Sequence, residues 1–408
     1  MEKVKIIGCA AAALGMVALT GCKKPMGDEV ELTVWVSEAD QAFAKEVARR
    51  FQEVNADKNY RFVFDVQGEN EMATRVLNDV ESAADVFSFP HDQLTQLVNG
   101  DALTRIGGAR LETLKAQNTA SSVAAGTVMR GESEEVYGLP YTDNTFFLYY
   151  DKSVFTESDV ASLDGILAKC SSKKKLGFMV ADGWYNSAFY FGKGLGYEVT
   201  YDSSLGETSI TCNFNNAVGQ KVTESLWNLV KDSRVKADAD DSKLVAGFSD
   251  GSIVAGFSGV WNRNAIQQAL GENFAAAKLP TYTFDGEQTQ LVAFAGYKLM
   301  GVNNYSDNKA EALAFADYYT NAESQIRHFE TRSYLPTNID ARKNEQIQND
   351  AVAKAIAAQL EYSKTQKNVP STFWNPLKGL GNAMLTGVQT GDFSLKAQLD
   401  ACVAAIVK

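Results

Sequence analysis

The sequence predicts an α/β protein of two lobes, each a mostly parallel sheet flanked by helices, with a ligand cleft between the lobes. Strand patterns alternate with helix patterns, which is typical of parallel sheets that helices cover on both faces. The alternation restarts after Tyr150, and the chain of 408 residues is longer than a single hydrophobic core usually supports. In sheets of this kind, ligands bind at the carboxyl ends of the strands.

The first lobe begins with a strand and an amphipathic helix. Residues 31–36 alternate between apolar and polar side chains, as a strand does. Residues 41–54 carry Phe43, Val47 and Phe51 at helical spacing, so they predict a helix with one apolar face. The next predicted elements are a strand over 60–66, a helix over 70–82 and a strand over 84–89 that ends at Pro90.

The second lobe is predicted from the same order of elements. Helices are expected over 163–169, 186–194 and 218–231, and strands over 176–180 and 252–256. Residues 291–303 contain two strand-like runs, and helices follow from 307–320 to the end of the chain. We therefore expect an N-terminal lobe of residues 32–141 plus 292–338 and a C-terminal lobe of residues 142–291 plus 339–408.

The N-terminus resembles a secretory signal followed by a lipid attachment site. A short basic start precedes an apolar stretch over 6–19, which is too short for a comfortable membrane span. Leu19-Thr20-Gly21-Cys22 resembles the lipobox of bacterial lipoproteins, whose cysteine takes the lipid; a secretory signal with a chance cysteine is the alternative. We expect a protein anchored on the outer face of the cytoplasmic membrane, with a signal peptide over 1–21 and a lipidated tether over 22–31.

The cysteines of the mature chain beyond Cys22 are Cys170, Cys212 and Cys402. Cys170 and Cys212 flank a segment rich in turns and short strands, and we expect them to form a disulfide, which an environment outside the cytoplasm allows. Cys402 lies in an apolar, helix-like tail and is expected to be a buried thiol. The alternative is that all three are reduced core cysteines.

Composition and motifs exclude several classes of protein. The net charge of −11, with acids and bases mixed along the chain, argues against nucleic-acid binding. The only histidines are His91 and His328, and no Cys-x-x-Cys occurs, so the sequence predicts no metal site. It contains no Walker loop, no Gly-x-Ser-x-Gly and no Gly-x-Gly-x-x-Gly after a strand, so neither a cofactor nor a catalytic motif is predicted.

Aromatic residues recur beside polar side chains at the predicted ends of elements. An aromatic ring can cover the C–H face of a pyranose, while carboxylates and amides bind its hydroxyls. The set therefore predicts a sugar-binding cleft, whereas Trp35 and Trp227 are expected in the core. Trp374 is expected in a loop, because Pro376 follows it. The candidates are Glu38; Phe89 with His91, Asp92 and Gln93; Trp184 with Tyr185; Trp261 with Asn262; and Trp374.

These motifs resemble those of ABC-transporter solute-binding proteins of the maltose/maltodextrin class, over nearly all of the mature chain. In ADVFSFPHDQLTQLVNGDAL (84–103) the resemblance places Phe89 at the stacking position and Asp92 and Gln93 at the polar pair. In LPYTDNTFFLYYDKS (139–153) the family's ligand-binding acid falls by register on Asn144, with Asp143 beside it. Which of the two faces the ligand is open, and a role of Asp143 in capping the turn alone is the alternative.

Three further motifs extend the resemblance. In DGWYNSAFYFGKGLGY (182–197) the family's tyrosine corresponds to Tyr185, although Gly183 stands where the family has an acid. FSGVWN (257–262) matches on Trp261. VPSTFWNPLKGL (369–380) matches on Trp374, with Lys378 in the place of the family's arginine.

The resemblance implies a two-lobe, periplasmic-binding-protein-like fold and a receptor that is not an enzyme. Its ligand would be an oligosaccharide, best matched by a maltooligosaccharide, and its partner the transmembrane subunits of an ABC permease. The receptor is expected to be a monomer without a cofactor.

The residues alone leave two other classes of protein possible. A lipid-anchored glycoside hydrolase would need two carboxylates that flank the scissile bond, and Asp92 and Asp143 are available. A binding protein for a peptide, polyamine or metal would need more acids beside these aromatics, or clusters of His, Tyr or Cys.

Overall fold

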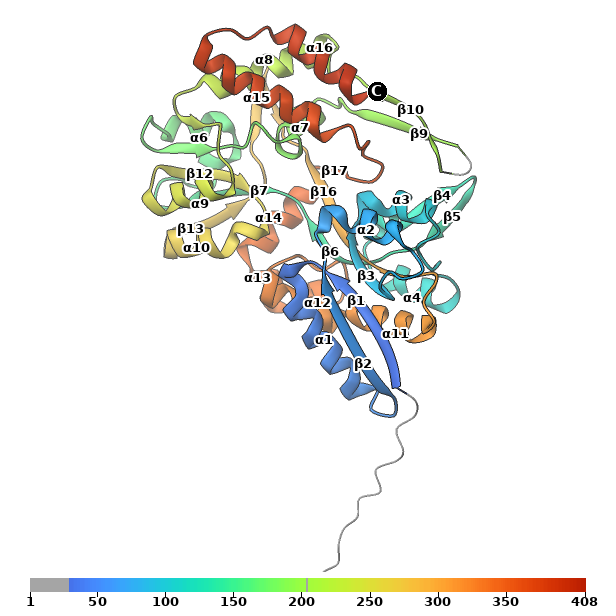
Figure 1. Cartoon of the computed structure of the whole chain (residues 1–408). Coiled ribbons are helices and arrows are strands. Elements are labelled where there is room, and N and C mark those ends of the chain that lie inside the picture. The colour runs from blue at the N-terminus through green and yellow to red at the C-terminus, as the bar shows by residue number, and fades with distance from the viewer. Residues whose placement is uncertain (1–28, 203–204) are drawn as a thin grey trace, which may run out of the picture.

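The computed structural model describes residues 29–202 and 205–408, and it has the predicted α/β fold of two lobes (Figure 1). The N-terminal sheet has the strand order β17-β16-β3-β1-β2, and β6 also pairs with β16. β1 is parallel to β2 and β3, whereas β16 runs antiparallel to β3 and β6. Its strands are β1 (Glu29–Val36), β2 (Asn59–Val66), β3 (Val86–Pro90), β6 (Leu139–Asn144), β16 (Ala293–Val302) and β17 (Ser363–Thr365).

The C-terminal sheet has the strand order β11-β8-β12-β7-β13. β8 is parallel to β11 and β12, whereas β7 is antiparallel to β12 and β13. Each sheet thus mixes parallel and antiparallel strands: β7 runs against its neighbours in the C-terminal sheet, and β16 together with its parallel partner β17 runs against the other strands of the N-terminal sheet. The strands are β7 (Phe147–Asp151), β8 (Lys175–Gly177), β11 (Val235–Lys236), β12 (Ile253–Ser258) and β13 (Phe274–Ala277).

Helices and short hairpins surround both sheets (Figure 1). The helices before β6 are α1 (Gln41–Val54), α2 (Met72–Asn78), α3 (Leu94–Asn99), α4 (Gly108–Gln117) and α5 (Ala120–Ala125). Those that follow are α6 (Leu163–Lys169), α7 (Gly183–Gly192), α8 (Ala217–Lys231), α9 (Asp241–Asp250), α10 (Arg263–Leu270), α11 (Lys309–Tyr319), α12 (Ala322–Arg332), α13 (Glu345–Asn349), α14 (Ala351–Leu360), α15 (Trp374–Thr390) and α16 (Leu395–Ile406). The hairpins are β4 (Thr127–Arg130) with β5 (Ser133–Val136), β9 (Tyr197–Tyr201) with β10 (Glu207–Cys212), and β14 (Thr281–Phe284) with β15 (Glu287–Gln290).

Each lobe has its own hydrophobic core, and the sequence periodicity explains how it forms. In β1 the side chains of Leu32, Val34 and Val36 are fully buried, in the alternation expected of a strand. Helix α1 has the predicted bounds, because its apolar stripe with Phe43 and Phe51 packs against this sheet. The C-terminal core is a separate cluster with many aromatic side chains, among them Phe178, Phe189 and Phe257.

The chain crosses between the lobes at β6–β7, at the start of β16 and at β17 (Figure 1). Thr145 links two of these segments, since its Oγ1 donates to the carbonyl of Phe294 at 2.8 Å. Residues 291–303 were expected as two runs, but β16 is one strand whose residues are all buried, so no polar alternation marks it. The expected lobe boundaries place β17 in the C-terminal lobe, yet β17 pairs with β16 in the N-terminal sheet.

The predicted disulfide is wrong in this structure: among the residues it describes, Cys170, Cys212 and Cys402 are free thiols. Cys170 ends helix α6 near Arg234 and Asp232, whereas Cys212 ends β10 and influences the titration of Cys402 on α16. The turns between Cys170 and Cys212 therefore do not bring their sulfurs together. Burial raises the pKa of Cys170 and Cys212 to about 11 and that of Cys402 to about 12.

Thiol titration checks this result. We expect unfolded, unreduced protein to yield one free thiol each from Cys170, Cys212 and Cys402. In folded protein the reaction should be slow, because burial favours the unreactive protonated thiol. A count of a single thiol from these positions would restore a disulfide.

No helix of the described residues is long and apolar enough to cross a membrane. The signal peptide, Cys22 and most of the expected tether lie outside the described residues.

Candidate functional site

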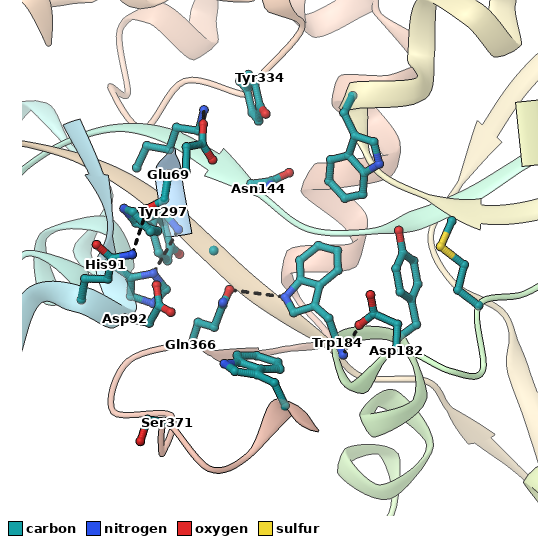
Figure 2. Close-up of a pocket in the computed structure, with 18 of the residues that line it drawn as sticks. Glu69, His91, Asp92, Asn144, Asp182, Trp184, Tyr297, Tyr334, Gln366 and Ser371 are labelled. Carbon is teal, nitrogen blue, oxygen red and sulfur yellow. Dashed lines mark hydrogen bonds and ion pairs between the residues drawn. The ribbon is translucent and has the colours of Figure 1, made fainter. Parts of the chain in front are cut away.

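A cavity of about 910 Å³ lies between the lobes, and residues from both lobes line it. Figure 2 shows Glu69, His91, Asp92 and Tyr297 on one side, Asp182 and Trp184 on the other, and Asn144 between them. The lining residues follow strand ends or lie on the crossing segments, where the α/β fold predicts a ligand site. The volume is large enough for several sugar rings.

The N-terminal wall is the turn after β3, and its side chains are mostly engaged with the protein. His91 is buried, its Nδ1 accepts from the backbone N–H of Tyr297 at 3.2 Å, and its Nε2 lies 3.3 Å from Thr365 Oγ1. Burial lowers the pKa of His91 to about 3, so the ring is neutral at physiological pH. Gln93 accepts from the N–H of Ala73 and donates to the carbonyl of Glu69, so it shapes the turn that presents Glu69.

Asp92 is the residue of this turn that remains available to a ligand. It lines the cavity, and its Oδ1 is buried without a hydrogen-bond partner. Burial raises the pKa of Asp92 to about 6. A ligand hydroxyl that donated to this carboxylate would supply the missing partner.

A buried ionic cluster forms the floor of the cavity. The ammonium group of Lys298, on β16, lies 3.0 Å from a carboxylate oxygen of the fully buried Asp40 and also contacts Glu69. The same Nζ lies 4.8 Å from the ring centre of Tyr334. The two carboxylates, of Asp40 and Glu69, are balanced by Lys298 and by Arg332, whose Nε lies 3.3 Å from Asp40, so the floor presents hydrogen-bonding groups without an excess of positive charge.

The segment between β6 and β7 separates the two polar residues that the sequence left undecided. Asp143 is buried and pairs with Arg342, and its backbone N–H donates to the carbonyl of Leu335 at 2.7 Å. Asn144 lines the cavity, and its Oδ1 is buried without a partner. Asn144 therefore faces the cleft. The carboxylate pair of Asp92 and Asp143 that a hydrolase would need is not formed.

The C-terminal wall is aromatic. Trp184 and Tyr185 lie in the first turn of helix α7, where Asp182 caps the helix by accepting from the N–H of Trp184 at 2.8 Å. The Tyr185 ring packs on Phe146, with ring centres 4.6 Å apart. Trp184 lies 5.6 Å from Trp261, centre to centre, so the rings form a continuous surface. Trp374 adds a further ring to this wall.

Trp374 was predicted to lie in a loop, but the structure makes it the first residue of helix α15. Pro376 is compatible with this position, because the N–H groups of the first helical turn have no partner in the helix. The ring packs against Phe294 and Phe373, with centres 5.3 Å away in each case, and still lines the cavity.

The structure brings together most of the predicted site residues. Those that line the cavity are His91, Asp92, Gln93, Asn144, Trp184, Tyr185, Trp261 and Trp374. Five predicted residues do not line it. Phe89 shares the face of Phe87 in β3 and is buried in the core, and Glu38 is exposed in the turn where Asp40 is the buried acid. The others are Asp143, Asn262, which donates to Asp241 and Ser258, and Lys378, which is exposed on α15.

Several polar residues of the cavity were not predicted from the sequence. Two of them could have been recognised from the sequence. Lys298 is the only charged residue in a strand of ten residues. Asp182 stands one residue before Gly183, the position at which the resemblance called for an acid. Tyr334 and Gln366 lie in irregular segments without a recognisable pattern. The missed lining residues are Glu69, Pro90, Met179, Asp182, Asp241, Gly296, Tyr297, Lys298, Tyr334, Gln366, Ser371 and Asn375.

An aromatic wall that faces carboxylates and amides across an interlobe cleft defines a two-lobe ligand-binding protein. The model of the family described as "Bacterial extracellular solute-binding protein" matches residues 46–355. The chain belongs to this family.

Similar proteins cover nearly the whole chain. A maltooligosaccharide ABC transporter solute-binding lipoprotein of Streptococcus pneumoniae is 23% identical, over 93% of this chain and 91% of its own. A galactooligosaccharide-binding protein of Bacillus subtilis is 24% identical, over 96% and 93%. A solved structure with acarbose is 31% identical and superposes with a TM-score of 0.81, over 93% of this chain and 99% of its own. The two-lobe fold and the solute-binding class are thereby confirmed.

Proposed function

We propose that this protein captures an oligosaccharide, best matched by a maltooligosaccharide, and delivers it to the transmembrane subunits of an ABC permease. It acts as a monomer and is not an enzyme. The observation that carries the proposal is the set of rings Trp184, Tyr185, Trp261 and Trp374 on one lobe, opposite Glu69 and Asp92 on the other. Rings of this kind cover the apolar faces of successive pyranoses while the acids bind hydroxyls.

Binding is coupled to closure of the lobes in this proposal. A sugar that stacks on the C-terminal wall reaches the acids of the N-terminal wall only when the lobes are close. Its binding energy therefore favours the closed form, which is the form that a permease would distinguish. The crossing segments, with Asn144 at the edge of the cavity, supply the hinge.

Calorimetry with a panel of sugars tests the ligand class. We expect maltotriose and longer maltooligosaccharides to bind more tightly than galacto- or xylo-oligosaccharides of equal length. The names of the relatives above support maltooligosaccharides, and the galactooligosaccharide-binding relative makes galactosides the second candidate. Tight binding of a galactoside without binding of any maltooligosaccharide would overturn the choice of sugar, and absence of binding to every sugar would overturn the class.

Hydrolysis is the alternative activity for a sugar in this cleft. Prolonged incubation with maltotetraose, followed by chromatography, should return the intact tetrasaccharide. Shorter products would reveal an enzyme.

The membrane anchor is part of the proposal and is tested at Cys22. Replacing Cys22 with alanine should give uncleaved precursor or shed protein, because the lipid-accepting thiol is gone. Mass spectrometry of the membrane fraction should find lipid on Cys22 in the wild type. A mature N-terminus at any other residue would contradict a lipoprotein.

Sugar affinity is expected to fall as the pH decreases through 6, because Asp92 titrates there. The pKa of Asp92 is raised by burial to about 6, and a hydroxyl donor favours the ionised form. Binding therefore lowers this pKa, so affinity is highest above pH 6 and decreases by up to about tenfold per pH unit below it. Asp92→Asn should bind more weakly at pH 7 and show a flat profile between pH 5 and 7, whereas a flat profile in the wild type would exclude this role.

A further inference from the structure

Trp261 is the most exposed large aromatic side chain of the cleft, with 38% of its surface accessible, yet its indole N–H is held by a hydrogen bond. Its Nε1 donates to Oδ1 of Asp241, in the first turn of α9, at 3.0 Å. Hydrogen bonds from indole N–H to a carboxylate are charge-assisted and directional. The ring of a half-exposed tryptophan would otherwise be free to change rotamer.

A polar chain fixes the Asp241 carboxylate in turn. Asn262 donates its Nδ2 to the same Oδ1 and also to the hydroxyl of Ser258, at 3.0 Å. Ser258 is fully buried at the end of β12. The position of the indole is thereby linked to the central sheet of the C-terminal lobe.

Gly259 provides the space beneath the ring. A Cβ atom at this position would lie 2.0 Å from Cζ3 of Trp261, far inside van der Waals contact. The backbone of Gly259 has φ −108° and ψ −167°, an extended conformation that any residue adopts. The backbone conformation therefore does not require glycine here, but the ring of Trp261 does.

We infer that Gly259 and Asp241 are positioning residues that hold the Trp261 ring as a preformed stacking plate for a sugar. The inference rests on the proposed function and adds how the plate is fixed before the ligand arrives. A ring ordered in the free protein loses less conformational freedom on binding than a mobile one. Gly259 does not line the cavity, whereas Asp241 does, so Gly259 is the position at which a change in affinity reports on the ring rather than on a direct contact with the ligand.

The first test needs no ligand. In protein labelled with ¹⁵N, the indole N–H signal of Trp261, assigned by its absence in Trp261→Phe, should be shifted by the carboxylate bond. Gly259→Ala and Asp241→Ala should both move it toward the position of a free indole. Asp241→Asn should keep most of the shift, because its amide oxygen still accepts. A signal that neither alanine variant moves would overturn the inference.

The second test measures maltotriose affinity by calorimetry. Gly259→Ala and Asp241→Ala should each weaken binding about tenfold, the loss expected when a side chain must be ordered on binding. Asp241→Asn should recover most of the affinity. Gly259→Ala combined with Trp261→Ala should bind no more weakly than Trp261→Ala alone. Wild-type affinity in Gly259→Ala, or a further loss in the double variant, would contradict the role.

Matched controls separate positioning from folding. Gly107→Ala adds a methyl group at an extended glycine with no atom within 4 Å of the new Cβ, and it should change neither readout. Asp240→Ala removes the N-cap of α9 beside Asp241 and should lower the melting temperature without moving the Trp261 signal. If the wild type binds no sugar of the panel, the proposed function is wrong, and if it binds only other sugars, the affinity test uses the tightest of them. In either case the indole signal still decides whether Asp241 and Gly259 hold the ring.

Discussion

Replacing Trp374 with alanine is expected to weaken oligosaccharide binding by about 30- to 1,000-fold. Truncation of a buried tryptophan anchor costs roughly 2–4 kcal/mol of binding free energy. Trp374 combines a ring that lines the cleft with a backbone fixed at the start of α15. One edge of the ring packs against Phe294 and Phe373, so the variant should lose a little stability but remain folded.

Trp227 provides the matched control, because it is a tryptophan on a helix remote from the cleft. Its ring lies on α8 and packs against Phe393, with centres 4.6 Å apart, while the ammonium of Lys231 lies 5.1 Å from the ring. Since Trp227 is only partly buried, Trp227→Ala should cost about 2–3 kcal/mol of unfolding free energy, less than a fully buried tryptophan. Affinity should remain near the wild-type value.

Urea denaturation and calorimetry on both variants decide the matter. The two variants should show opposite effects. Trp374→Ala should fold but bind sugar poorly, whereas Trp227→Ala should bind sugar normally but be less stable. A Trp374→Ala protein with unaltered affinity for every sugar of the panel would mean that the cleft lies elsewhere.

The sequence predicted the regular elements best where burial follows a simple period. Helix α1 and helix α6 have the expected bounds, because each buries apolar residues at helical spacing. β16 could not be resolved in the same way, since it is buried on both faces and carries no alternation. The class of ligand followed from aromatic residues at element ends, which the fold gathers at one edge of each sheet.

The site was predicted less completely because its polar residues depend on contacts between distant segments. Phe89 matched a family motif, but successive side chains of β3 point to opposite faces of the sheet, so Phe89 lies in the core beside Phe87. Lys298 and Asp40 are separated by 258 residues, so no local pattern links them. The disulfide failed for the same reason: a turn-rich segment between two cysteines does not fix where their sulfurs lie.

Replacing Asp40 with asparagine should cost about 3–5 kcal/mol of unfolding free energy, the largest loss of stability expected from a single polar substitution here. The carboxylate of Asp40 is fully buried and contacts Lys298, His328 and Arg332, at 3.0, 3.2 and 3.3 Å. Without it the ammonium of Lys298, with only 9% of its side chain accessible, keeps Glu69 as its one anionic partner among the described residues. Asp40→Asn therefore removes one of the two carboxylates that compensate a buried ammonium, which is far more costly than breaking a surface pair.

The pH dependence of this loss distinguishes a charge effect from a packing effect. Burial alone would raise the pKa of Asp40, but Lys298 and the hydrogen bond from His328 outweigh it and hold the pKa well below its ordinary value. A depressed folded-state pKa adds stability that is present above the unfolded pKa near 4 and is lost as the pH falls further. The difference between wild type and Asp40→Asn should therefore be constant from pH 5 to 8 and shrink below pH 4.

Two companion variants complete the experiment, measured by urea denaturation at pH 7 and pH 3. Combining Asp40→Asn with Lys298→Met should recover at least half of the lost stability, because an apolar side chain of similar length replaces the ammonium that has lost its buried partner. Asp340→Asn, which removes the exposed pair with Lys343, should leave the midpoint nearly unchanged. If Asp40→Asn lost the same stability at both pH values and Lys298→Met recovered none of it, the cluster would stabilise the fold through packing and hydrogen-bond geometry rather than through charge.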